Sequence, residues 1–181
     1  MPVIDTPQRY GTFTRFLHWV VAILVIWQLV TASVTALAED SALDELLWAT
    51  HKPAGFTILL LMVLRLIWAL FNLSRRPASI SALARLGHIT LYALLLIIPG
   101  LALLRQYGSG RAFEPFGLPL MSGFEGGKIE WMMAPANLLH GWLGWTLFVI
   151  ALGHVLMTLH HRFSRKSEDV MPRMLGVPPR Q

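Results

Sequence analysis

The stretch ANLLHGWLGWTLFVIALGHVLMTLH, residues 136–160, decides the fold of this chain. It contains no Asp, Glu, Lys or Arg, and a membrane-spanning helix needs about 20 mostly apolar residues. It also carries His140 and His154, and ionisable side chains are costly inside a bilayer and usually functional. The stretch therefore predicts a membrane helix whose histidines have a chemical role.

Three other stretches have the same apolar character, and the composition agrees with them. Of 181 residues, 55% are hydrophobic and 14% are charged, against roughly 25% charged in soluble domains. We predict an all-α integral membrane four-helix bundle, formed by residues 1–181 as one domain. Its spans are expected at about 16–38, 50–73, 86–104 and 136–160.

Basic residues are distributed unevenly between the two sides of the predicted bundle. One side, with both termini and the second loop, holds ten Lys and Arg, and the other side holds four. The tail contributes Arg162, Arg165, Lys166, Arg173 and Arg180. The positive-inside rule therefore predicts cytoplasmic termini. These positions beside lipid headgroups account for the net charge of +5 without a nucleic-acid partner.

The chain has no cysteine and seven histidines. The missing thiols exclude cysteine-ligated zinc, cysteine-ligated iron–sulfur clusters and covalent C-x-x-C-H haem attachment. Histidine is therefore the main side chain that can bind a metal here.

His140 and His154 share one helix face at two depths. They are 14 residues apart, which is about 21 Å and close to four helical turns. Helix direction puts His18 at the inner level with His154, and His51 at the outer level with His140. Two facing imidazoles can hold a haem iron from both sides. The competing interpretation is interfacial or hydrogen-bonding histidine.

Several further residues allow more than one interpretation. His88, at the inner level, could replace His18 as a ligand, line a quinone pocket or meet a haem propionate. Arg65 lies 14 residues after His51 and would contact a propionate or quinone, or else snorkel or cap carbonyls. His160 and His161 fit the membrane interface.

Glycine and tryptophan positions give weaker signals. Gly55 and Gly144 follow His51 and His140 by four residues, so they could clear space for a flat macrocycle or simply allow close helix packing. Trp27, in mid-span, is expected to belong to the core.

The chain resembles the bacterial cytochrome b561 family, and within it the short dihaem proteins that include the superoxide:ubiquinone oxidoreductase. The matching segments are Arg15-Phe16-Leu17-His18-Trp19, His51-Lys52-Pro53-Ala54-Gly55, Leu64-Arg65-Leu66, Gly87-His88-Ile89, Phe113–Pro119 and the spacing from His140 to His154. The resemblance covers nearly the whole chain. One departure is the spacing from His154 to His160-His161, which is one residue shorter than in the family pattern.

The resemblance implies a multi-pass protein of the bacterial inner membrane with two non-covalent haem b groups. His18 and His154 would hold the inner iron, and His51 and His140 the outer iron. Electrons would pass from a periplasmic donor, with superoxide as one candidate, to ubiquinone in the quinone pool. This hypothesis makes the chain an oxidoreductase.

The charge of the outer surface bears on the donor. The outer side carries seven acidic residues and four basic residues. This net negative charge opposes steering of an anion, unless the basic residues form a local entrance. Those basic residues are Lys52, Arg105, Arg111 and Lys128. Two alternatives remain: a haem-bearing anchor subunit of a periplasmic dehydrogenase or hydrogenase, and a haem-free structural or transport bundle.

Overall fold

A computed structural model describes residues 2–164 and 168–177 of the chain. Its elements are α1 (Thr12–Leu37), α2 (Ala42–Phe71), α3 (Ala82–Gly108), the 3-10 turn η1 (Pro115–Gly117), α4 (Glu130–Phe163) and α5 (Met171–Leu175). Helices α1 to α4 are each long and apolar enough to cross a membrane. The predicted all-α four-helix membrane bundle is therefore confirmed. The tail residues Arg165, Lys166 and Arg180 lie outside the described residues.

Helices α2 and α3 begin before the apolar stretches that predicted them. Ser41 and Ser81 each precede a helix, and their hydroxyls accept from the backbone N–H of Asp44 and Ala84. A serine cap satisfies a donor that the first helical turn leaves free. The polar first turns therefore belong to the helices although hydropathy does not mark them.

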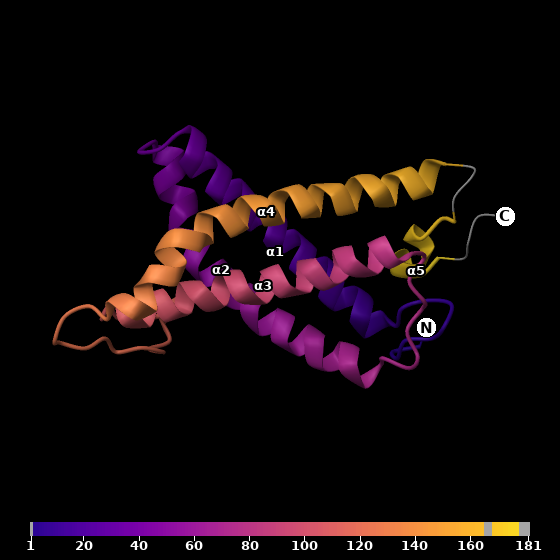
Figure 1. Ribbon diagram of the computed structural model, residues 1–181, viewed down its shortest axis with the longest axis horizontal. Coiled ribbons are helices and arrows are strands. Elements are labelled where there is room, and N and C mark those ends of the chain that lie inside the picture. Colours follow the sequence, from indigo (N-terminus) through magenta and orange to yellow (C-terminus); the bar gives the residue numbers. More distant parts are fainter. Residues whose placement is uncertain (1, 165–167, 178–181) are drawn as a thin grey trace.

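The four long helices run up and down, and consecutive helices pack together. Helix α1 packs along α2, α2 along α3, and α3 along α4. The segment before α1 and helix α5 lie at the same end of the bundle, and the α1–α2 and α3–α4 connections lie at the other (Figure 1). Which end faces the cytoplasm stays a prediction, as does the single-domain organisation.

The buried core lies in the middle of the bundle. It consists of one cluster drawn from all four helices: Val21, Val25, Ile58, Met62, Leu94, Leu95, Ile98 and Leu147. Leu147 is midway along the chain between His140 and His154. Close-packed apolar side chains therefore separate two polar levels and keep water out between them.

The end of the bundle that carries both termini is closed by polar contacts. Asp5 is buried and accepts from the Gly11 N–H at 2.8 Å and the Thr14 hydroxyl at 2.6 Å. Its other carboxylate oxygen lies 3.3 Å from Arg76 Nε. These contacts tie the segment before α1 to the α2–α3 connection.

The C-terminal segment completes this closure. Arg15 donates to the Leu175 carbonyl at 2.9 Å, and Trp19 Nε1 donates to the Met174 carbonyl at 3.4 Å. Arg173 donates to the Ala78 carbonyl at 2.8 Å. Helix α5 therefore lies against the start of α1, one turn from His18.

Candidate functional site

Five of the seven histidines gather at two levels of the bundle. The inner level holds His18 on α1, His88 on α3 and His154 on α4. The outer level holds His51 on α2 and His140 on α4. Helix α4 therefore contributes one imidazole to each level, as its 14-residue register predicts.

The imidazoles form one facing pair at each level. The ring centroids of His18 and His154 are 6.4 Å apart, with their planes at 74°. Those of His51 and His140 are 6.3 Å apart, with their planes at 64°. The two pairs thus have nearly the same separation although they join different helices.

This separation fits an iron ion between the rings. A metal–imidazole bond is about 2.1 Å, and the ring centre lies about 1.1 Å beyond the nitrogen, so two opposed ligands place their centroids about 6.4 Å apart. His88 and His154 are only 5.3 Å apart. By this criterion His18 is the better partner for His154, and His88 is a neighbour of the pair.

The backbone also leaves room at the levels of the two pairs. Among the described residues, the backbone of α4 approaches α1 and α2 much less closely than it approaches α3, yet its histidine rings reach rings on both. A Cβ placed on Gly144 or Gly153 would meet no other atom within 4 Å. Space beside α4 is what a flat macrocycle between facing helices requires.

The two glycines highlighted in the sequence have different surroundings. Open space lies beside Gly144, whereas a Cβ on Gly55 would be 3.3 Å from Gln28 Nε2. Gly55 therefore serves the close contact between α1 and α2, and only Gly144 has the surroundings that a macrocycle needs.

A hydrogen bond from Thr31 fixes the His51 ring. Thr31 is fully buried, and its Oγ1 is 2.9 Å from His51 Nδ1 and 2.8 Å from the Gln28 carbonyl. A threonine has one donor proton, and the carbonyl can only accept it. His51 Nδ1 must then donate to Thr31, which leaves the lone pair of Nε2 free to bind a metal.

Other side chains hold the same part of α2. Gln28 donates to the His51 carbonyl at 3.0 Å, and the Trp48 ring stacks on the His51 ring at 4.5 Å. Neither Gln28 nor Thr31 was among the site residues predicted from the sequence. Gln28 and Thr31 are polar residues inside an apolar span, and this property could have identified them from the sequence.

The inner level contains a buried cation. Arg65 Nη2 lies 3.0 Å from His18 Nδ1, and its guanidinium carbon lies 5.2 Å from the centre of the Tyr92 ring. Because arginine can only donate, His18 Nδ1 accepts this bond, and the neutral ring carries its proton on Nε2. The inner and outer pairs thus differ in how their rings are held.

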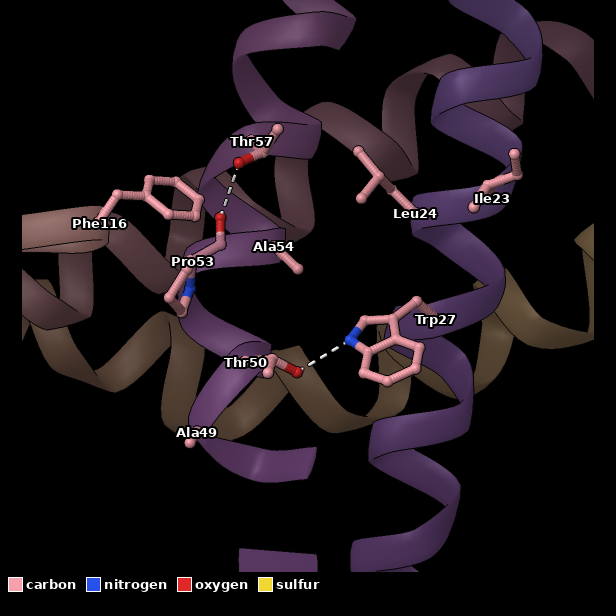
Figure 2. Close-up of a pocket in the computed structure, with 9 residues that line it drawn as sticks. All are labelled: Ile23, Leu24, Trp27, Ala49, Thr50, Pro53, Ala54, Thr57 and Phe116. Carbon is pink, nitrogen blue, oxygen red and sulfur yellow. Dashed lines mark hydrogen bonds between the residues drawn. The ribbon is translucent and has the colours of Figure 1, made fainter. Parts of the chain in front are cut away.

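An apolar pocket opens between α1 and α2 beside the outer pair (Figure 2). Its volume is about 580 Å³, and its lining residues are Ile23, Leu24, Trp27, Ala49, Thr50, Pro53, Ala54, Thr57 and Phe116. Trp27 is 41% exposed, so its expected place in the core was wrong. Its Nε1 instead donates to the Thr50 hydroxyl at 2.8 Å across the pocket mouth.

The last two histidines lie beyond the inner level, at the end of α4. The ring centroids of His160 and His161 are 5.9 Å apart. Among the described residues, neither ring contacts His18 or His154. Their predicted interfacial role remains a prediction.

A cysteine-free membrane bundle with two facing imidazole pairs belongs to the class of proteins that hold haem between helices. The family model for prokaryotic cytochrome b561 matches residues 9–176. Cytochrome b561 homolog 2 of Escherichia coli strain K12 is 31% identical over 191 aligned residues, with 97% of this chain and 96% of the relative covered. The chain belongs to the prokaryotic cytochrome b561 family. It is a multi-pass protein of the bacterial inner membrane that binds b-type haem and transfers electrons.

Proposed function

We propose that this cytochrome holds two haem b groups and transfers electrons between an outer donor and the quinone pool. His18 and His154 hold the inner iron, and His51 and His140 hold the outer iron. A bound haem supplies reversible one-electron exchange at its iron.

The single observation that carries this proposal is the matched spacing of the two histidine pairs. Centroid separations of 6.4 Å and 6.3 Å fit one iron in each pair. Since α4 supplies a ligand to both, the two sites are held about 21 Å apart along one helix.

The surrounding residues act as supports for these ligands. Thr31 holds His51 in the tautomer that leaves Nε2 free to bind. The apolar cluster around Ile58 and Leu147 excludes water between the levels. The fixed ligand and the water-free core both favour electron transfer between the two sites.

The outer donor is assigned from the predicted orientation. With both termini in the cytoplasm, the α1–α2 and α3–α4 connections face the periplasm. Lys52 lies at this end, 3.3 Å from Gln106, beside a pocket of about 240 Å³. Asp44 on the same side is buried and accepts from the Thr35 hydroxyl. One of the seven acidic residues is thereby withdrawn from the surface that a donor would contact.

A quinone acceptor is supported by the pocket between α1 and α2. Its volume falls within the range of about 300–1,000 Å³ typical of small-molecule sites, and exposed Ile23 and Trp27 form part of its rim. Trp27, Pro53 and Phe116 offer flat surfaces to a ring (Figure 2). Thr50 lies in its wall and directly precedes His51, so a quinone bound there would exchange electrons with the outer haem.

Proteoliposomes test this function directly. The purified chain is placed in liposomes that contain ubiquinone, and superoxide is generated outside. Two superoxide ions and two protons should convert one ubiquinone into ubiquinol, with release of two O₂. Haem reduction by dithionite but not by superoxide would remove superoxide as the donor. Haem reduction without ubiquinol formation would remove the quinone as the acceptor.

A further inference from the structure

Among the described residues, two arginines lie over tyrosine rings in similar ways, and a carboxylate pairs with one of them but not with the other. Arg76 is 5.4 Å from the Tyr10 ring and 3.3 Å from Asp5. Arg65 is 5.2 Å from the Tyr92 ring. In the described part of the chain, the ion pairs of Asp and Glu involve Arg76, Arg162 and Arg173, and none involves Arg65.

The polar atoms around Arg65 are incompletely bonded. Arg65 Nε and the Tyr92 hydroxyl are both buried and have no hydrogen-bond partner among the described protein atoms. The bond from Nη2 to His18 Nδ1 reaches a neutral acceptor. A guanidinium inside a membrane span is costly unless an anion and further acceptors meet it.

We propose that Arg65 and Tyr92 form a carboxylate-binding site, and that its occupant is a propionate of the inner haem. This inference rests on the proposed inner haem between His18 and His154. A guanidinium binds a carboxylate through two parallel N–H bonds, and a tyrosine hydroxyl donates a third. The haem carboxylate then does for Arg65 what Asp5 does for Arg76.

The site also accounts for the contact between Arg65 and His18. While Arg65 donates to His18 Nδ1, the ring proton lies on Nε2. When the guanidinium turns to a carboxylate, Nδ1 takes up that same ring proton and Nε2 is left free for the iron. Arg65 is thus a positioning residue for the inner ligand as well as an anchor for the macrocycle.

Tyr92 is the residue that this site adds to the expected set. It follows His88 by one helical turn on α3, so the two side chains share one face. Helix α3 supplies no ligand in the proposed pairs. Tyr92 gives it a contact with the inner haem through the macrocycle edge.

The test uses the haem-loaded full chain and two readouts. Resonance Raman spectroscopy follows the propionate bending bands, and transfer of haem to apomyoglobin measures haem loss. The variants are Arg65→Leu, Arg65→Lys and Tyr92→Phe. The matched controls are Arg85→Leu and Tyr107→Phe, two exposed residues of α3. EPR of wild-type protein first establishes that two bis-histidine haems are present, and their absence would refute the proposed function itself.

We expect Arg65→Leu and Tyr92→Phe to shift the propionate bands of one haem and to speed its loss, by about tenfold for Arg65→Leu. Arg65→Lys should restore retention in part, and the controls should match wild type. Unchanged bands and unchanged haem loss in both Arg65→Leu and Tyr92→Phe would overturn the proposal. If Arg65→Leu yields no folded protein, shifted bands in Tyr92→Phe support the site and unchanged bands refute it.

Discussion

The hydroxyl of Thr31 on α1 lies 2.9 Å from Nδ1 of His51 on α2 and donates its own proton to the Gln28 carbonyl. This relationship fixes which nitrogen of His51 is free. Bonds of this kind orient metal ligands, and their loss typically lowers metal affinity by about 10–100-fold.

Replacing Thr31 with valine should therefore loosen the outer haem alone. We expect Thr31→Val to speed loss of that haem by about tenfold and to leave the inner haem unaffected. Haem transfer to apomyoglobin, followed separately for each haem band, measures this. Thr90→Val is the matched control, since the Thr90 hydroxyl donates to the Leu86 carbonyl of its own helix. If Thr31→Val lost both haems at equally increased rates, Thr31 would not act on the outer site alone.

The predicted orientation can be read by labelling, because the natural chain has no cysteine. Ser122→Cys lies in the α3–α4 connection and Ser79→Cys in the α2–α3 connection, and both positions are exposed. In intact spheroplasts a membrane-impermeant maleimide should label Ser122→Cys, and should label Ser79→Cys only after lysis. The reverse labelling pattern would show that the topology is inverted, with the proposed donor side in the cytoplasm.

Filling the pocket between α1 and α2 should block the quinone and spare the haems. Ala54 lines this pocket, so Ala54→Phe should slow haem oxidation by ubiquinone at least about tenfold, which corresponds to about 1.4 kcal/mol. Reduction by dithionite and the haem spectrum should not change. Ala134→Phe, exposed at the start of α4, is the control. Wild-type rates in Ala54→Phe would place the quinone elsewhere.

Alkaline pH should weaken the closed end of the bundle through Tyr10, which precedes α1. Burial raises the pKa of Tyr10 above its ordinary value of 10.0. The unfolded chain then loses this proton first, so stability falls as pH rises from about 10 towards the folded pKa. Thermal unfolding followed by circular dichroism should show this loss in wild type and a smaller one in Tyr10→Phe. An identical slope in both proteins would remove Tyr10 as the cause.

Much of the site could be predicted because helix register is a property of the chain itself. The 14 residues between His140 and His154 fix their common face, and helix direction fixes their levels. Contacts across the bundle depend on how each helix is rotated, which the sequence does not state. The partners Thr31 and Tyr92 were missed for this reason.

Trp27 was wrongly predicted to belong to the core because the rotation of its helix could not be predicted. A tryptophan in mid-span has the hydropathy of a core residue, but hydropathy cannot separate a face that meets another helix from one that meets lipid. The structure places Trp27 at a pocket rim with 41% of its surface exposed. The glycines differ likewise, since Gly55 faces Gln28 and Gly144 faces open space.

The haem content of the purified chain tests the central claim most directly. A pyridine haemochrome assay with a protein determination should give two haem b per wild-type chain. His51→Ala and His18→Ala should each lower that ratio towards one, with loss of the outer and inner spectral band respectively, and His88→Ala should retain both haems. One haem per wild-type chain, or none, in a well-folded sample would contradict the assignment of two iron sites to these two histidine pairs.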